Sequence, residues 1–230
     1  MIQKKGKNSQ AASMPKSHGS GQKLLLIELP KPTQGRDSSM FKALQQRKTI
    51  REVSDKKLSL QVLSNLLWAA YGINRKIGPF GIPGRTAASA SNSQEIDLYI
   101  AMQEGIYIYN AFHHSLIPVV AGDLRALAIG PGQANFVAKA TVQLIYVVDI
   151  HKLSNTSGYQ EPGLQDPEIQ KSYYYVDTGL IAGNVYLFAA SQGLASWFHN
   201  CNKSSLTEKL KLRSDQRVLF GQTVGYPVKK

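Results

Sequence analysis

The 230-residue chain has a single cysteine, Cys201. One cysteine excludes an intramolecular disulfide and a metal site made of several cysteines, and such a residue is typically a small buried hydrophobe. Long hydrophobic runs are also missing. No run approaches the roughly 18 apolar residues that cross a bilayer, and residues 24–27 are too few for a signal-peptide core. We therefore expect no membrane partner and a cytoplasmic location, or a periplasmic one if a preceding signal has been removed.

Acidic residues are scarce, with 15 Asp and Glu against 27 Lys and Arg, a net charge of +12. Such an excess raises nucleic acid as a partner, and a basic nucleic-acid-binding module is one interpretation of this chain. We expect no nucleic-acid partner, because no helix-turn-helix, zinc or aromatic-basic RNA motif is present. Five lysines precede Glu28, and residues 1–22 lack apolar periodicity, so they are predicted to be a disordered basic tail before a single domain at residues 23–230.

Apolar residues recur at helical spacing in several segments. Ser59 is a favourable N-cap and Gly72 a favourable C-cap for the helix between them, and residues 173–193 are apolar almost all round, which predicts a central helix. Further helices are predicted from Ser38 or Ser39 to the basic cluster at residues 47–51, over residues 123–128, and from a capping box at residues 205–208.

Strand-like runs alternate with these helices. Residues 96–102 and 106–109 predict a hairpin, residues 116–120 a third strand, residues 142–149 a strand buried on both faces, and residues 217–224 a final strand. Residues 73–85 contain too many glycines and prolines for a regular element, and residues 154–171 form a long polar stretch, so both are predicted as loops. The mixed order predicts an α+β domain.

The cluster formed by Arg47, Lys48, Thr49 and Arg51 has no helix face or strand alternation to explain it. Arginine offers a planar fork of donors that holds a phosphate bidentately, lysine adds a point charge, and a threonine hydroxyl with local backbone N–H groups completes an oxygen shell. We interpret the cluster as an anion clamp. The alternative is a solvated group of charges that offsets the dipole of the preceding helix.

Five motifs follow one another along the chain. Arg47-x-Thr49-x-Arg51 precedes a leucine-rich run at residues 58–73, a small polar run at 85–95, a helical phrase at 177–191 and Val-Gly-Tyr-Pro at 224–227. This order resembles the nitroreductase superfamily of FMN flavoproteins. Residues 66–74, Leu-Leu-Trp-Ala-Ala-Tyr-Gly-Ile-Asn, are most similar to its branch of azoline-forming (thiazole/oxazole) dehydrogenases.

The resemblance covers about residue 29 to the end of the chain. It implies a nitroreductase-like fold, with a central mixed, mainly antiparallel sheet flanked by helices. It also implies an interlocked homodimer with two FMN sites built between the subunits.

The resemblance carries over to individual residues. Those matched to the phosphate and ribityl chain of FMN are Arg47, Lys48 and Thr49. Arg51 matches the cation near the pyrimidine edge of the flavin ring. Relatives supply another basic residue to the phosphate from the end of the chain, and Lys229 or Lys230 is the candidate here.

A small polar loop matches the one that the other subunit lends to the flavin ring. Its residues are Ser89, Ala90, Ser91, Asn92 and Gln94. This chain departs from the family pattern at two positions where proline is common, since it has Ala88 before the small residues and Glu95 after the glutamine.

Phe198, His199 and Asn200 fall where relatives place a segment over the flavin face. Together with Trp197, these side chains are predicted to stack on the ring or to control access to it. The alternative is that Trp197 and Phe198 alternate in a strand packed on the core.

The chemistry implied is that of an FMN-dependent oxidoreductase, in which NAD(P)H is the electron donor and a small organic molecule such as a nitroaromatic or a quinone is the acceptor. A flavin-binding protein, or a peptide-azoline dehydrogenase-like enzyme without general nitroreductase activity, is the alternative. No catalytic triad, P-loop or dinucleotide fingerprint is present. His113 and His114 lack accompanying ligands at metal spacing, so we expect no metal site.

Overall fold

The computed structural model describes residues 38–133, 142–157 and 165–229. The predicted tail at residues 1–22 and the alternative phosphate ligand Lys230 lie outside the described residues. The helices are α1 (Ser38–Gln46), α2 (Leu60–Tyr71), α4 (Ile150–Ser154), α5 (Pro167–Ser191) and α6 (Lys203–Lys209), with 3-10 turns η1 (Pro79–Gly81), η2 (Ala90–Asn92) and η3 (Arg125–Ala128). The strands are β1 (Ile73–Arg75), β2 (Gly84–Arg85), β3 (Ile96–Ala101), β4 (Gly105–Asn110), β5 (Ser115–Ala121), β6 (Val142–Asp149), β7 (Ala195–His199) and β8 (Gln216–Gly225).

Six strands form one sheet in the order β5-β4-β3-β6-β8-β7, and every neighbouring pair in it is antiparallel. The predicted hairpin is therefore confirmed as β3–β4, with β5 as the third strand beside it. The family resemblance implied a mixed, mainly antiparallel sheet flanked by helices, and every pair among the described strands of this sheet is antiparallel. Short turns join β3 to β4 and β4 to β5, whereas the chain passes through α4 and α5 between β6 and β7 and through α6 between β7 and β8.

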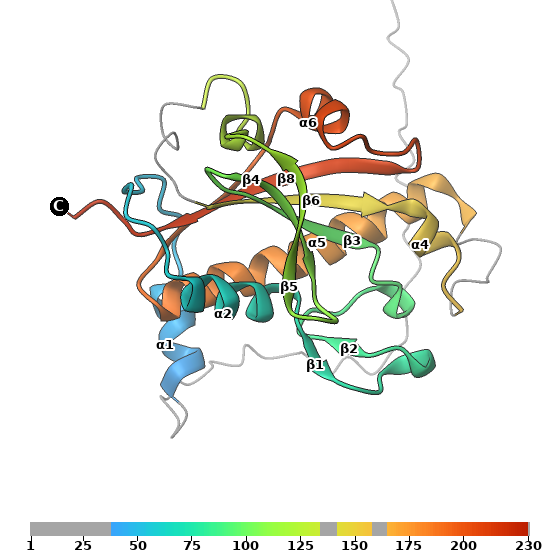
Figure 1. Ribbon diagram of the computed structural model, residues 1–230. Helices are drawn as coiled ribbons and strands as arrows, with labels where there is room; N and C mark the ends of the chain where they lie inside the picture. Colours follow the sequence, from blue (N-terminus) through green and yellow to red (C-terminus); the bar gives the residue numbers. More distant parts are fainter. Residues whose placement is uncertain (1–37, 134–141, 158–164, 230) are drawn as a thin grey trace, which may run out of the picture. The chain divides into compact units, whose positions relative to one another are not determined.

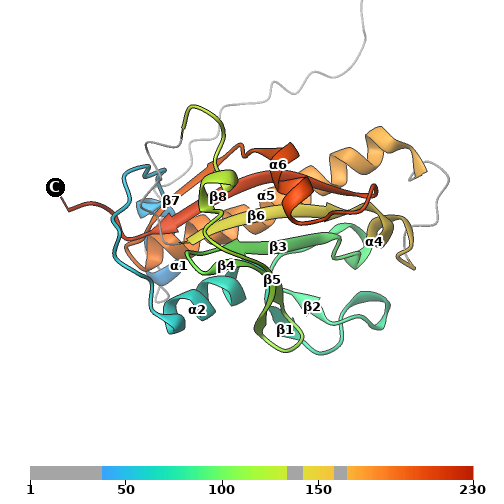
Figure 2. The ribbon, with the colours of Figure 1, turned by 45° about the horizontal axis from the view of Figure 1, so that its top comes forward.

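Helices cover both faces of this sheet (Figure 1). On β6 the even-numbered residues, such as Tyr146, pack toward α2 and α5, while Ile145 and Val147 pack toward η3 and α6. Successive side chains of a strand point to opposite faces, so all eight β6 residues are buried. The predicted two-face burial of this strand is confirmed, and the turned view in Figure 2 shows α6 in front of the strands and α5 behind them.

Helix α2 begins and ends where its capping residues predict. The Ser59 hydroxyl accepts a hydrogen bond from Val62 N–H at 3.2 Å, and Gly72 N–H donates to Trp68 O at 2.8 Å. A Cβ at Gly72 would lie 2.5 Å from Trp68 Cδ1 and 2.7 Å from its carbonyl oxygen. Only glycine therefore allows the chain to leave the helix so close to the indole.

Helix α5 is longer at its start than the sequence predicts. Asp166 caps it by accepting from Glu168 and Ile169 N–H groups, and Pro167 occupies the first helical position, where its missing N–H costs nothing. This first turn is polar, and it lies at the end of a long polar stretch. The apolar pattern consequently signals the helix only from residue 173.

Two local predictions are wrong. The capping box at residues 205–208 does not begin α6, because the helix starts at Lys203 and the Asn202 side chain accepts from Ser205 N–H. Residues 73–85 are not loop throughout, since β1 and β2 pair as a short antiparallel ribbon on either side of η1. The breakers in that stretch lie at the turn between the two strands.

Candidate functional site

The basic segment, residues 47–51, follows α1 and runs beside the edge strand β7. Ile50 N–H donates to Ser196 O at 3.0 Å, and Val53 forms an isolated antiparallel bridge with Pro227. Ile50 and Val53 both pack on Trp197 in a small apolar cluster. The apolar side chains thus fix the segment on the sheet edge, which leaves the charged side chains between them at the surface.

An open cavity of about 640 Å³ lies at the basic segment. It is lined by Lys48, Thr49, Ile50, Arg51, Glu52, Pro227 and Val228. Among the described residues no carboxylate forms an ion pair with Arg47, Lys48 or Arg51. Cations without such a partner keep their donors for a ligand, so this cavity suits an anion such as a phosphate.

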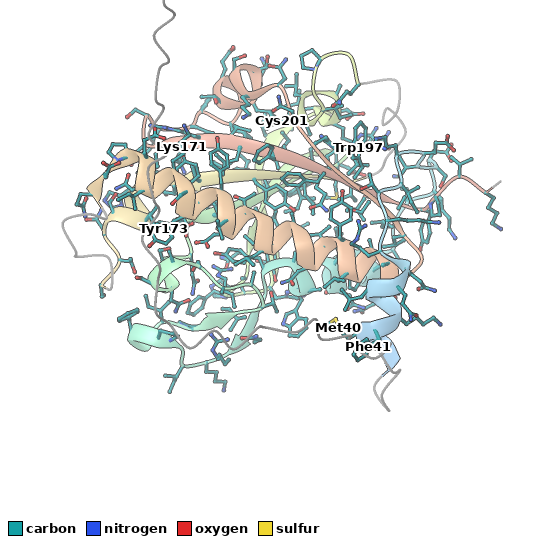
Figure 3. All side chains as sticks on the ribbon, turned by 180° about the vertical axis from the view of Figure 1, so that it is seen from behind. Met40, Phe41, Lys171, Tyr173, Trp197 and Cys201 are labelled. Atoms are coloured by element: carbon teal, nitrogen blue, oxygen red, sulfur yellow. The ribbon has the colours of Figure 1, made fainter. Side chains whose placement is uncertain are left out.

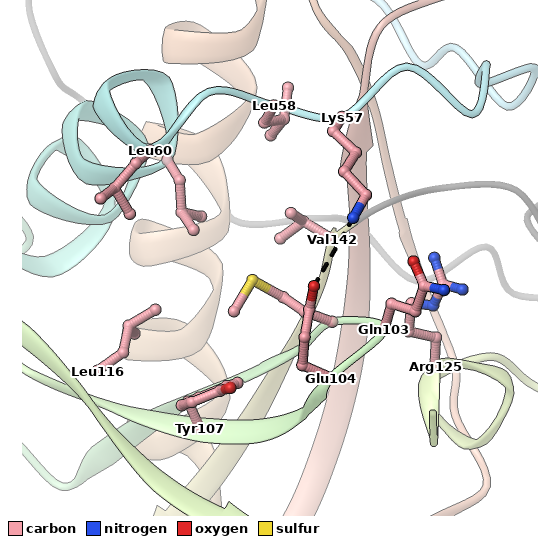
Figure 4. Close-up of a pocket in the computed structure, with 11 residues that line it drawn as sticks. Lys57, Leu58, Leu60, Gln103, Glu104, Tyr107, Leu116, Arg125 and Val142 are labelled. Carbon is pink, nitrogen blue, oxygen red and sulfur yellow. Dashed lines mark ion pairs between the residues drawn. The ribbon is translucent and has the colours of Figure 1, made fainter. Parts of the chain in front are cut away.

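A second cavity, of about 240 Å³, shows the contrast (Figure 4). Its Lys57 forms an ion pair with Glu104 at 3.7 Å, and Arg125 donates to both carboxylate oxygens of Asp123, at 2.8 and 2.6 Å. Both of these cations already have a carboxylate partner, and much of the remaining lining is apolar. Positive charge available to a ligand therefore distinguishes the cavity at the basic segment.

Tyr186 of α5 connects the basic segment to the sheet. Its hydroxyl lies 3.3 Å from Thr49 Oγ1 and accepts from Phe198 N–H at 2.9 Å, while the Arg47 guanidinium lies 5.6 Å from the centre of its ring. Arg51 lies 5.0 Å from the Trp197 ring. Aromatic faces hold both guanidinium groups by cation–π contact, which orients their donors before a ligand binds. Tyr186 was not predicted as a site residue, although a hydroxyl within the apolar stretch at residues 185–190 is a signal for a specific contact.

The strained loop, residues 89–94, is the second predicted part of the site. Ser91, Asn92 and Gln94 have φ angles of 50°, 53° and 53°. This left-handed region is unfavourable for residues with a Cβ, and such strain concentrates at functional sites when the surroundings enforce it.

Three neighbouring parts of the chain enforce this conformation. Ala90 N–H donates to the Asp177 carboxylate of α5 at 2.8 Å. The Asn92 amide donates to Ile82 O at 3.3 Å, and the Gln94 amide donates to Pro83 O at 2.6 Å while its oxygen accepts from Arg85 Nε at 2.6 Å. The loop is thus held from α5, from the turn at residues 82–83 and from β2, so it is ordered before any ligand arrives.

One chain does not bring the two parts of the site together. Asp177 holds the strained loop and Tyr186 holds the basic segment, and they lie nine residues apart on α5. Nine residues are two and a half helical turns, so the two side chains point to opposite sides about 13 Å apart along the axis. Within a single chain the basic segment and the strained loop therefore lie at different places and do not form one site.

Strand β7 follows the alternation predicted for a strand packed on the core. Trp197, labelled in Figure 3, packs beside the basic segment, while Phe198 faces Tyr146 and Phe220 on the other side, with ring centres 5.8 and 4.8 Å away. A flavin contact by Phe198, His199 or Asn200 stays a prediction.

The His199 side chain is buried in the interior of the fold. Its Nδ1 lies 2.8 Å from Asn200 O and its Nε2 lies 2.8 Å from Thr223 Oγ1. Burial lowers the pKa of His199, which keeps the ring neutral near pH 7. An imidazole with both nitrogens engaged and a lowered pKa is poorly suited to deliver a proton to a ligand.

Two further candidates lie at the ends of elements. Lys229 is exposed and follows Val228, whose N–H donates to Glu52 O at 3.2 Å beside the cavity.

The His114 ring nitrogens lie 2.7 Å from Ser64 Oγ and 2.8 Å from the Tyr109 hydroxyl. The described residues contain no cluster of three or more side chains able to bind a metal ion, and no helix among them is long and apolar enough to span a bilayer.

The model of the nitroreductase family matches residues 44–226, which include the basic segment, the strained loop and α5. The chain belongs to the nitroreductase family. Membership makes it an oxidoreductase of the nitroreductase type.

Individual relatives agree with this assignment. The chain is 28% identical over 157 residues to MJ1384 of Methanocaldococcus jannaschii, a protein named as a nitroreductase, covering 65% of this chain and 72% of that one. A crystal structure from Ralstonia eutropha JMP134, also named as a nitroreductase, is 32% identical with a TM-score of 0.72, and 88% of this chain matches 89% of it.

More distant structures share the fold of this nitroreductase. The Escherichia coli microcin synthetase McbBCD complex has a TM-score of 0.62 at 18% identity, with 91% of this chain and 79% of that chain covered. The NADPH:FMN oxidoreductase of Vibrio harveyi has a TM-score of 0.56 at 18% identity, with 83% and 70% covered. At these identities the likeness concerns the fold alone.

Proposed function

We propose that this nitroreductase is an FMN-dependent enzyme that passes electrons from NAD(P)H to a small organic acceptor, such as a nitroaromatic or a quinone. The observation that carries the proposal is the cavity lined by Lys48 and Arg51, which, like the neighbouring Arg47, form no ion pair with a carboxylate among the described residues. A flavin mononucleotide carries one phosphate of matching charge, and structural relatives include an NADPH:FMN oxidoreductase. We expect the protein to act in the cytoplasm.

The residues present fit such a ligand. Arg47, Lys48 and Thr49 would hold the phosphate and the ribityl chain, with Lys229 as a further cation from the C-terminal segment. Arg51, fixed over Trp197, would lie at the pyrimidine edge of the ring. Bound FMN supplies the transfer of hydride or single electrons, while the protein binds and orients the ligand and sets the charge around it.

We also propose that the enzyme is a homodimer in which each strained loop reaches the FMN site of the partner. On α5, Val176 is 59% and Leu180 is 45% exposed, and a Cβ at Gly179 or Gly183 would meet no atom within 4 Å. Helix α1 adds further exposed apolar side chains, two of which Figure 3 labels as Met40 and Phe41. A broad apolar surface with small residues at its centre suits a second copy of the same helix.

Release of the cofactor by heat and its identification by chromatography test the proposal directly. We expect FMN rather than FAD, and Arg47→Met with Lys48→Met should weaken uptake of added FMN at least about tenfold, because two phosphate cations are lost. Lys42→Met on α1 is the matched control and should bind as the wild type does. A colourless protein that takes up no added FMN contradicts the proposal.

A second candidate is an enzyme that oxidises peptide azolines and lacks general nitroreductase activity. Residues 66–74 and the fold shared with the microcin synthetase complex favour it. Bound flavin that NAD(P)H does not reduce, but that an azoline-containing peptide does, would support this candidate. Strongly salt-dependent binding of DNA by a protein that takes up no flavin would instead support a nucleic-acid-binding module.

A further inference from the structure

Glu95 is a fully buried carboxyl at the point where the strained loop enters β3. Its exposed fraction is 0%, and its Oε2 accepts from Ser93 Oγ at 2.6 Å. Its Oε1 has no hydrogen-bond partner among the residues that the structure describes.

The groups around Glu95 come from several elements, and none of those described is a cation bound to its carboxyl. Asp177 of α5 is 4% exposed and accepts the Ala90 N–H, while Tyr71 of α2 brings a buried hydroxyl that has no partner in the described part of the chain. The Arg85 guanidinium lies 4.3 Å from the Tyr71 ring centre, but it donates to Gln94 Oε1 and Tyr71 O.

Further along β3, Asp97 already has a partner, since Lys152 lies 2.5 Å from its carboxylate. Lys152 is therefore not available to compensate a charge on Glu95. Within the described ranges, Glu95 and Asp177 thus form a buried pair of acids without a counter-ion of their own.

Two carboxyl groups in a dry site do not both ionise at neutral pH. Burial first and the charge of Asp177 second raise the pKa of Glu95 to about 8, and burial raises the pKa of Asp177 as well. Asp177 accepts a backbone N–H, which favours its ionised form, and its contact with Glu95 lowers the pKa of Asp177 while it raises the pKa of Glu95. The proton of the pair therefore resides on Glu95.

We propose that Glu95 and Asp177 share a single proton and that this half-ionised pair positions the strained loop, so that losing the proton releases the loop from α5. Ionised Glu95 would repel the Asp177 carboxylate that holds Ala90 N–H. The left-handed residues of the loop would then lose an anchor that enforces their conformation. The consequence for FMN rests on the proposed function, whereas the movement of the loop does not.

Amide hydrogen exchange in the loop tests the proposal without any cofactor. Protection of the Ala90 amide, corrected for the intrinsic rate, should fall about tenfold or more between about pH 7 and about pH 9.5 in the wild type. Glu95→Gln keeps the shape but not the charge, and should retain its protection across this range. Glu104→Gln, which removes an exposed carboxyl, is the control and should follow the wild type.

The same alkaline loss of protection in Glu95→Gln, or no loss in the wild type, would overturn the proposal. If Glu95→Gln does not fold, infrared spectra of the wild type provide a second readout. The carbonyl stretch of the protonated acid should disappear at the pH at which Ala90 loses protection, and separate transitions would refute the link. A parallel FMN titration distinguishes the two ideas, because failure to bind FMN at any pH contradicts the proposed function and leaves the exchange result valid.

Discussion

Removal of one hydroxyl group, by Tyr186→Phe, tests whether α5 holds the basic segment in place. The hydroxyl accepts the Phe198 N–H at 2.9 Å and lies 3.3 Å from Thr49 Oγ1. In this variant the aromatic ring stays in place beneath the Arg47 guanidinium, so the substitution removes these two polar contacts alone. Both the stability of the fold and the position of Thr49 should respond.

The loss of stability depends on how well water can replace each polar contact of the tyrosine hydroxyl. Thr49 is exposed, so water takes the place of the tyrosine at little cost, whereas the half-buried Phe198 N–H loses its acceptor on the outer edge of β7. An unsatisfied buried donor costs about 1–3 kcal/mol, and partial access of water reduces this to about 1–2 kcal/mol. The equilibrium constant for unfolding should therefore rise about 5- to 30-fold.

Urea unfolding at fixed protein concentration measures this effect, with an unchanged m-value as evidence that the mechanism of unfolding is the same. Tyr175→Phe on the same helix is the matched control. Its ring contacts Tyr174 and Phe220, and its hydroxyl forms no hydrogen bond with the described residues, so it should change the free energy of unfolding by less than about 0.5 kcal/mol. Equal effects of the two substitutions would refute the anchoring role of Tyr186.

Three further outcomes follow from the site. Arg51→Met should lower the flavin midpoint potential by about 30 mV, because a cation near the reduced ring stabilises it by about 1–2 kcal/mol after screening. Arg47→Met should mainly weaken FMN binding. Spectroelectrochemical titration of both variants tests these two roles. Leu180→Glu should convert the dimer into a monomer in light scattering, because a charge would replace an exposed apolar contact of α5. The pKa of Glu95 is raised in the folded state from its ordinary 4.5 to about 8, so the folded state binds more protons than the unfolded state between these pH values. The free energy of unfolding should therefore fall as pH rises through this window. Glu95→Gln should make the free energy of unfolding less dependent on pH in the same window.

Periodicity predicted the layers of the fold well because the core determines them. The continuous apolar run of β6 predicts burial on both faces, and the apolar spacing from Leu63 to Ala70 predicts the face of α2 that packs on α5. Boundaries were harder, since Pro167 and Lys203 begin helices with polar turns. The capping residues Asp166 and Asn202 are polar, and polar residues are also typical of loops, so the sequence alone does not mark where these helices begin.

The candidate site was predicted only where its chemistry lies in one short stretch. The basic segment and the strained loop are such stretches, whereas Tyr186 meets Thr49 across 137 residues and Asp177 meets Ala90 across 87. Contacts of that range depend on how α5 crosses the sheet, which no local pattern encodes. Glu95 was noted as a departure from proline, but its buried partner was not.

The opposite directions of Asp177 and Tyr186 on α5 lead to a prediction about mixed dimers. If each FMN site combines the basic segment of one chain with the strained loop of the other, Arg47→Met damages the first and Asp177→Ala, which removes the acceptor of the Ala90 N–H, damages the second. In a mixed dimer one site then carries both defects and the other carries none. Co-expression with two purification tags should therefore recover about half of the wild-type FMN binding, at wild-type affinity, although each variant alone binds weakly. Sites formed within one chain would instead keep one defect each, and the mixed dimer would bind no better than the two variants.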